Sequence, residues 1–512
     1  MKGNKAVSRS GKLFMLRDTA VFAGANYVIQ ALGIVNSIAL RRFMGPAAMG
    51  VWSILQVILG YCGYANLGTT KAMARDYPYY RGRGNHAQAE QLKDLVVTFS
   101  MVMSVIPAVV ILIYLVLQWH QLILPLRFGL LFMVGFLFIE RFSDVILDLL
   151  RADKKFILLS KVKVLDAVSG LLVTLILVSW WNIYGLVIGT ALVTVGCLLF
   201  IYRTNPYQFN YVWESTALWR ELKLGIPLIA ATFLGTILKS LDKLIIAKEL
   251  GFYEVGLYSI VTMVNNYMFS LPMAFSNVWY PYMQEEFGRQ GGANGIKNYL
   301  LTPVFTLSIL VPFLTGMAVF LMPLVAQVLL PKFMGGLPAM KIYLLGTFFV
   351  LLGQFSGKFL VTLDKYLLNI PLLGVSAGLN YILNITFVKM GWGLEGVALG
   401  TLISFVFYGI TSYFVALKNF SNGKESALVV GRMLLTVTAF FGSIFLLDRW
   451  VHPESVYVAA FLKVALFCLF SAPFFWVAER KVGLWRLFRE GLSRKGAPYP
   501  PAAVEETNRS GD

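Results

Sequence analysis

The sequence is poor in cysteine, histidine and charge. Its 512 residues include three cysteines and three histidines, and 14% are charged, whereas soluble proteins are nearer about 25%. Cys62, Cys197 and Cys468 all fall within apolar segments, which predicts small buried side chains and no disulfide framework. The histidines lie far apart, so no Cys/His cluster has metal-ligand spacing. The sequence also lacks G-x-x-x-x-G-K-[ST], the usual motif of ATP hydrolysis.

Apolar residues dominate what is present. They make up 58% of the chain, and the mean hydropathy is +0.70. This composition predicts an all-α polytopic membrane protein. The net charge of +18 could suggest nucleic acid. In a membrane protein, basic cytoplasmic loops beside anionic lipid account for such a charge, so we expect no nucleic-acid partner.

Apolar runs of about 20 residues predict 14 transmembrane helices. Of the 44 Lys and Arg, 32 fall in alternate connections and ends, eight in the opposite connections and four within spans. This bias predicts that both termini of the multi-pass protein lie in the cytoplasm. The predicted spans are 18–40, 48–69, 94–117, 124–149, 160–180, 184–202, 223–247, 253–283, 299–323, 339–361, 366–388, 394–417, 429–447 and 455–477.

The chain repeats itself. MGPAAMGVWSI (44–54) matches LGFYEVGLYSI (250–260) at an offset of 206, and GLVIGTALV (185–193) matches GVALGTLIS (396–404) at 211. Asp153-Lys154 and Asp364-Lys365 share the second offset. An even number of spans per copy predicts two parallel six-helix lobes. The expected domains are lobes 1–215 and 216–423, two further helices in 424–478 and a cytoplasmic tail 479–512.

These ordered segments resemble a known family. LRRFMGPAAMGVWSI, LGIPLIAATFLGTILKSLDKLIIAKELGFYEVGLYSI, LLRADKKFILLS and LNYILNITFVKMGWGLEGVALGTLIS are similar to the Wzx-type polysaccharide-lipid flippases of the multidrug/oligosaccharidyl-lipid/polysaccharide exporter superfamily. The resemblance implies two six-helix bundles around a central cavity that opens alternately to each side. It also implies transport of an undecaprenyl-pyrophosphate-linked oligosaccharide across the bacterial cytoplasmic membrane, for lipopolysaccharide O-antigen or exopolysaccharide synthesis. Its implied partners are a polymerase and chain-length machinery.

Three charges interrupt the seventh span, TILKSLDKLI (236–245). Lys239, Asp242 and Lys243 follow i, i+3, i+4 spacing, so they share one helix face. A charge at the bilayer centre costs roughly 2.5–3.5 kcal/mol on insertion scales. One interpretation is a cationic patch for pyrophosphate, with Asp242 moderating the affinity or taking up H⁺ or Na⁺. The alternative is an internal Lys–Asp pair that locks the lobes. We expect no cofactor beyond such a coupling ion.

A second cluster ends the fourth span. Glu140, Asp144 and Asp148 follow i, i+4, i+8 spacing towards the cytoplasmic mouth. They predict a coupling or gating cluster, with solvated helix-end charges as the alternative. Arg141 is the deepest charge and is expected to line the cavity. Lys358, late in the tenth span, is a plausible partner that faces the cluster.

Arg41 and Arg42 end the first span. Snorkelling to outer headgroups explains both, while Arg42 is retained as a substrate-binding candidate.

Three other functions compete with the flippase prediction. Cation-coupled drug exporters and lipid II flippases belong to the same superfamily as the Wzx-type flippases that this sequence resembles. A membrane polysaccharide polymerase is an enzyme, and it would usually need a sizeable extramembrane loop. The connections here are short, so we expect a transporter and not an enzyme.

Overall fold

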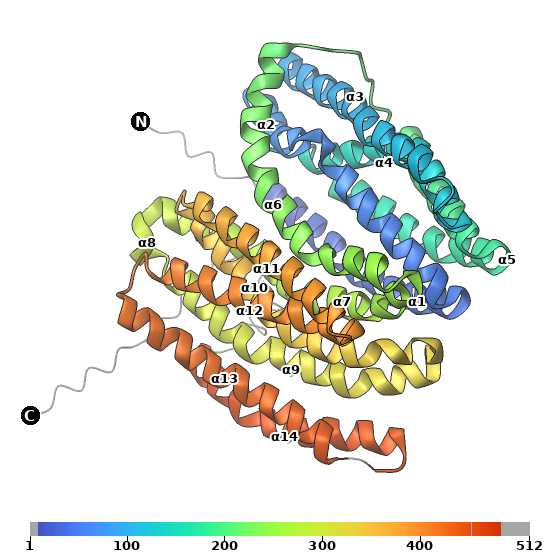
Figure 1. Ribbon diagram of the computed structural model, residues 1–512. Helices are drawn as coiled ribbons and strands as arrows, with labels where there is room; N and C mark the ends of the chain where they lie inside the picture. The colour runs from blue at the N-terminus through green and yellow to red at the C-terminus, as the bar shows by residue number, and fades with distance from the viewer. Residues whose placement is uncertain (1–8, 452, 483–512) are drawn as a thin grey trace, which may run out of the picture. The chain divides into compact units, whose positions relative to one another are not determined.

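The computed structural model describes residues 9–451 and 453–482, and within them it contains helices and no β-strand (Figure 1). The predicted all-α class is confirmed, while most of the predicted tail 479–512 lies outside the described residues. The α-helices are α1 (Arg9–Cys62), α2 (Thr69–Gly82), α3 (His86–Gln118), α4 (Leu124–Ala152), α5 (Phe156–Thr204), α6 (Ser215–Glu249), α7 (Phe252–Gln290), α8 (Gly292–Gly295), α9 (Asn298–Leu329), α10 (Leu337–Thr362), α11 (Asn369–Lys389), α12 (Gly393–Leu417), α13 (Gly423–Trp450) and α14 (Val456–Val482). Three 3-10 helices are η1 (Gly63–Asn66), η2 (Pro331–Gly336) and η3 (Tyr366–Leu368).

Two helices are too long to be single spans. α1 has 54 residues and α5 has 49, so each exceeds about 70 Å at about 1.5 Å per residue, against a bilayer core of about 30 Å. Each contains one non-helical residue, Gly45 (φ 75°) in α1 and Asn182 (φ 51°) in α5. These breaks fall between predicted spans, at 41–47 and 181–183.

The number of spans stays a prediction. By length and apolarity, nine helices of the described residues could cross a membrane, or ten if the two parts of α6, Ser215–Pro227 and Ile229–Glu249, count as one bent span. This count treats α1 and α5 as one span each. All 14 predicted spans nevertheless lie largely within α-helices, although 124–149 in α4 and 253–283 in α7 lie in helices outside this count.

The chain forms two compact units. The first comprises Met1–Ile260 and Leu329–Gly336, and the second comprises Val261–Val328 and Leu337–Asp512. In the first unit α1 packs on α5, α4 lies between α3 and α5, and α2 contacts α3, α4 and α6 (Figure 1). In the second unit α12 packs on α10 and α11, and α13 lies beside α14. α6 thus belongs to the first unit by its contacts, whereas the lobe boundary at 215 and 216 remains a prediction.

The repeated glycine motif makes a reciprocal contact within the first unit. A Cβ on Gly50 would lie 1.7 Å from the carbonyl oxygen of Phe252, and a Cβ on Gly256 would lie 1.8 Å from that of Pro46. Both pairs are related by the sequence offset of 206, so each copy of the motif presents the same surface to the other, as in a two-fold interface. Only glycine permits this approach of two backbones.

A second repeated feature is the turn that follows α4 and α10. Lys154 and Asp364 both adopt left-handed backbone geometry, with φ of 58° and 57°. The next lysine in each copy, Lys155 or Lys365, donates through Nζ to an asparagine Oδ1 at the end of α5 or α12, at 3.0 and 2.6 Å. The turn therefore recurs at an offset of 210, one residue less than the offset of the Asp-Lys match.

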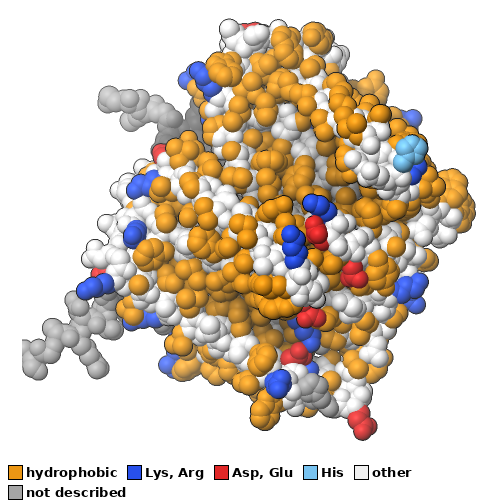
Figure 2. Space-filling model, in the orientation of Figure 1, with side chains coloured by type: hydrophobic (Ala, Val, Ile, Leu, Met, Phe, Trp, Pro, Cys, Tyr) orange, Lys and Arg blue, Asp and Glu red, His pale blue; other side chains and the backbone are white. Residues whose placement is uncertain are grey.

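Hydrophobic side chains cover most of the face shown in Figure 2. Trp450 and Phe461 are 79% and 77% exposed, which is typical of helices that face lipid. Cys62 and Cys197 are buried, as predicted, but Cys468 is exposed. That part of the cysteine prediction is wrong because α14 turns most of its surface away from the protein interior.

Candidate functional site

The acidic face of α4 lines a cavity in the first unit. The cavity measures about 560 Å³, and Glu140, Asp144 and Asp148 all contribute to its wall. Their spacing of four residues keeps them on one side of α4, as the sequence predicts. The opposite walls come from α1, η1, α2 and α6. The structure therefore brings the three predicted carboxylates together around one cavity.

Three cations line the same cavity. Arg141, Arg151 and Lys71 balance the three carboxylates. Arg151 bonds to Asp148. Lys71, on α2, donates to the hydroxyl of Thr232 on α6 at 3.3 Å. Arg151 was expected to adjoin the acidic cluster, whereas Lys71 was counted only among the basic residues of the connections.

Arg141 is the buried cation of this cavity, with 6% of its surface exposed. Its Nη1 lies 3.2 Å from Asp144 Oδ2 and donates to the carbonyl of Gly63 at 3.3 Å. Gly63 permits this approach, because a Cβ there would lie 3.2 Å from Arg141 Nη2. In the part of the chain that the structure describes, Arg141 Nε and Glu140 Oε2 are buried without a hydrogen-bond partner. Each such atom costs about 1–3 kcal/mol, so the cavity retains unused binding capacity.

α6 presents a stripe of hydroxyl side chains to α1 and η1. Thr232, Thr236 and Ser240 recur every four residues and share one helix face. The hydroxyls of Tyr61 and Ser240 lie 2.6 Å apart, and that of Tyr64 bonds to Thr236. These contacts fix the rotation of α6, and with it the direction of the charges in TILKSLDKLI.

Asp242 points into the protein. It is fully buried, whereas Lys239 and Lys243 are half-buried. The Tyr258 hydroxyl donates to Asp242 Oδ2 at 2.8 Å, and the Lys243 amide donates to Oδ1 at 3.1 Å. Among the described ion pairs none joins Asp242 to either lysine. Its described partner is thus a tyrosine on α7, and the cationic patch remains a prediction.

Arg41 and Arg42 have different surroundings. Arg41 is buried; its Nη2 donates to the Ser259 carbonyl at 3.0 Å and its Nη1 to the Ser37 carbonyl at 2.9 Å. The snorkelling interpretation is therefore wrong for Arg41. Arg42 is exposed and is not among the residues that line the α4 cavity.

Lys358 belongs to the second unit. Its Nζ donates to Ser276 Oγ at 2.7 Å and lies 5.5 Å from the centre of the Tyr280 ring. Both described partners are neutral. A contact with the α4 carboxylates remains a prediction.

Sequence analysis also missed a charged cluster in the second unit. Asp448 on α13 bonds to Lys341 on α10 and to Lys463 on α14. The sequence did indicate one member of this cluster. Lys463 falls within a predicted span, and a lysine there requires a partner. Across residues 9–451 and 453–482, no group of three or more His, Cys, Asp and Glu side chains could hold a metal ion.

The long apolar helices of the described chain, together with the charged cavity, are typical of a multi-pass membrane protein. The chain belongs to the family described as polysaccharide biosynthesis protein, whose model matches residues 39–334. This confirms the predicted family.

Solved structures share the fold of this chain. The lipid II flippase MurJ, in an inward closed conformation, has a TM-score of 0.66 at 15% identity, over 90% of this chain and 99% of its own. A mutant of the Vibrio cholerae MATE transporter VcmN has a TM-score of 0.56 at 16% identity, over 80% of this chain and 96% of its own. At these identities the likeness shows the fold. Among curated protein sequences, none matches this chain.

Proposed function

We propose that this protein carries an undecaprenyl-pyrophosphate-linked oligosaccharide repeat unit across the bacterial cytoplasmic membrane by alternating access. The product would feed lipopolysaccharide O-antigen or exopolysaccharide synthesis, together with a polymerase and chain-length machinery. The observation that carries the proposal is the α4 cavity, which lies in the segment matched by the polysaccharide biosynthesis family and holds the buried guanidinium of Arg141.

The cavity chemistry suits a diphosphate that must bind and then leave. Arginine binds phosphate through two parallel N–H donors. Asp144 occupies one arginine nitrogen, Nη1, so an incoming phosphate competes with the carboxylate for it. Uptake of H⁺ by Glu140 or Asp144, or of Na⁺ between them, would weaken this competition and link phosphate binding to the ion gradient. With three carboxylates and three cations the cavity has no net charge, so its affinity for the diphosphate stays low enough for release.

The charged face of α6 supplies a second set of phosphate contacts in this proposal. Lys239 and Lys243 act as point charges on half-buried stems. Asp242, held by Tyr258, fixes the local electrostatic field and moderates the affinity of the lysines. Asp148, paired with Arg151, serves as a gate at the end of the cavity.

Two other transport functions are supported by the solved structures that share the fold. One structure is a lipid II flippase and others are MATE transporters. A lipid II flippase would need the same pyrophosphate contacts with a different sugar. A MATE-like exporter would use the carboxylates of the α4 cavity for a cationic drug. A polymerase is disfavoured by the short connections between the helices.

A leaflet assay separates these functions. The full-length protein is reconstituted with a fluorescent undecaprenyl-pyrophosphate oligosaccharide, with lipid II or with a cationic dye, and the label in each leaflet is followed. We expect transport of the oligosaccharide lipid alone. Transport of lipid II alone, or of the dye alone, would establish the corresponding alternative.

The same assay tests the lysines of α6. Lys239→Ala combined with Lys243→Ala should lower oligosaccharide-lipid transport roughly 10-fold or more, since hydrogen bonds to charged groups are worth about 1.5–3 kcal/mol. Lys248→Ala is the matched control, because that lysine ends the same helix and has a 78% exposed side chain. Unchanged transport in the double variant would refute the cationic patch.

A further inference from the structure

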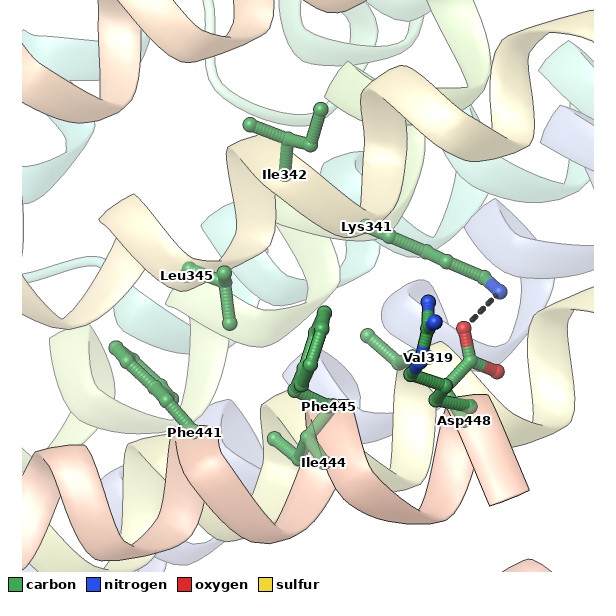
Figure 3. A pocket seen from close by; sticks show the side chains of 9 residues that line it. Val319, Lys341, Ile342, Leu345, Phe441, Ile444, Phe445 and Asp448 are labelled. Atoms are coloured by element: carbon green, nitrogen blue, oxygen red, sulfur yellow. Dashed lines mark hydrogen bonds and ion pairs between the residues drawn. The ribbon is translucent and has the colours of Figure 1, made fainter. Parts of the chain in front are cut away.

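A second cavity lies beside the charged cluster of the second unit. It measures about 550 Å³. Figure 3 shows Lys341 and Asp448 at one end, and Leu345 and Phe441 at the other. The cavity is therefore amphipathic, with a charged end and an apolar remainder. Its lining residues come from α9, α10 and α13 and are Val319, Lys341, Ile342, Leu345, Phe441, Ile444, Phe445, Asp448 and Arg449.

The charged end has more cations than one carboxylate neutralises. Asp448 Oδ2 lies 2.6 Å from Lys341 Nζ, and its Oδ1 lies 2.9 Å from Lys463 Nζ. Arg449 also lines the cavity, and it takes part in none of the ion pairs found in the described chain. Three cations against one anion leave a local charge of about +2, and the Arg449 fork has the geometry that binds phosphate.

One edge of the apolar remainder opens to the surroundings of the protein, while Val319 and Ile444 on its inner side are buried. Phe445 is 66% exposed, and Leu446 beside it is 56% exposed. Both α13 and α14 are apolar enough to cross a membrane. A side chain so exposed on a membrane helix contacts acyl chains. A ligand of this cavity can therefore have its chains in the bilayer and its head at the cations.

We propose that this cavity binds an anionic phospholipid of the surrounding bilayer. The phosphate lies against Lys341 and Arg449, and the first methylenes lie along Phe441 and Phe445. The charge bias of the loops places this end of α13 outside, so the lipid belongs to the outer leaflet of the membrane. The site is separate from the α4 cavity, and it concerns a resident lipid and not the transported one. The inference thus stands or fails independently of the proposed function.

Substitution of Asp448 and substitution of the cations should change the lipid affinity in opposite directions. The carboxylate competes with the lipid phosphate for Lys341. Removal of a cation should weaken lipid binding, whereas Asp448→Asn should strengthen it by releasing two lysines. A purely structural role for the cluster predicts the opposite for Asp448→Asn, because a loosened α13 would also lose the cavity.

The experiment is native mass spectrometry of the full-length protein, titrated with phosphatidylglycerol or with phosphatidylcholine of the same acyl chains. Each basic residue near a membrane surface contributes about 1 kcal/mol, or about fivefold. Lys341→Gln with Arg449→Gln should lower phosphatidylglycerol affinity roughly 25-fold, and Asp448→Asn should raise it about fivefold. Lys389→Gln is the control, since this exposed lysine also belongs to the second unit.

Two further measurements keep the test decisive if the charge variants unfold. Phe445→Ala alters an exposed side chain away from the ion pairs, and it should lower phosphatidylglycerol affinity several-fold. Inorganic phosphate should not displace the lipid at equal concentration, because it lacks acyl chains. Equal binding of both phospholipids, an unchanged cation variant, or weaker binding after Asp448→Asn would overturn the proposal.

Discussion

The two cavities have nearly the same volume, about 560 and 550 Å³, but they differ in how their charges are paired. In the first unit, Arg141 and Glu140 each keep one buried atom without a hydrogen-bond partner among the described residues. In the second unit, one carboxylate, Asp448, bonds two lysines. A paired charge holds helices together, whereas a buried charge with spare capacity retains interaction for a ligand. The comparison assigns the transported substrate to the first cavity, whereas beside the second the Asp448 pairs join α13 to α10 and α14, and the excess cations remain for a resident lipid.

Substitution of Arg141 is the strongest way to break this comparison. Arg141→Gln should lower transport of the oligosaccharide lipid roughly 10- to 100-fold, because a charged hydrogen bond is worth about 1.5–3 kcal/mol. The leaflet assay measures the effect. Arg203→Gln, which alters an exposed arginine at the end of α5, is the control. Equal transport rates in the two variants would show that the substrate does not bind in the α4 cavity.

Substitution of one carboxylate in each unit compares how much the two charged clusters contribute to the free energy of unfolding. Asp448→Ala leaves two lysines without their shared partner and should cost about 1–2 kcal/mol. Asp144→Ala should cost less than about 1 kcal/mol, because its side chain is 49% exposed. Denaturant titration of the purified protein measures both. A larger loss for Asp144→Ala would reverse the assigned roles.

A methyl group tests the position of Arg141 while its charge is kept. Gly63→Ala places a Cβ 3.2 Å from Arg141 Nη2, so the guanidinium must shift by a few tenths of an ångström. We expect transport to fall about fivefold, from about 1 kcal/mol of weakened hydrogen bonding, with the melting temperature nearly unchanged. Gly135→Ala on α4 is the control, since its Cβ meets nothing within 4 Å. An unaffected Gly63→Ala variant would argue against a requirement for this geometry.

A modest effect on stability alone is expected for a paired charge outside the predicted spans. Burial raises the pKa of Asp153, but hydrogen bonds from Tyr207 and Lys155, with Arg81 nearby, lower it below its usual value. A lowered pKa contributes stability above the unfolded value, near pH 4, and this is lost as the pH falls through the folded value. Tyr207→Phe should therefore cost about 1 kcal/mol at pH 7 and less below pH 4. Melting temperatures across this range check the sign, and a difference that grows in acid would contradict it.

Much of the fold followed from local sequence patterns. Apolar runs located the helices, and the glycines at 50 and 256 marked the two copies of one repeated motif, whereas the contact between the copies was found only in the structure. The spacing of Glu140, Asp144 and Asp148 placed them on one face, because the helical period alone decides that. That this face lines a cavity was decided by packing, because the opposite walls come from α1, η1, α2 and α6.

The tertiary structure decided which charges meet. The sequence placed Arg41 and Arg42 side by side, yet one is buried against Ser259 and the other is exposed. It placed Asp242 between two lysines, yet the described partner is the hydroxyl of Tyr258. The helical period fixes which residues share a face, whereas the partner of that face depends on how each helix rotates and crosses its neighbours. Those angles are set by packing between residues far apart in the chain, so the sequence determined the helices and their faces, and only the folded structure determined the pairs.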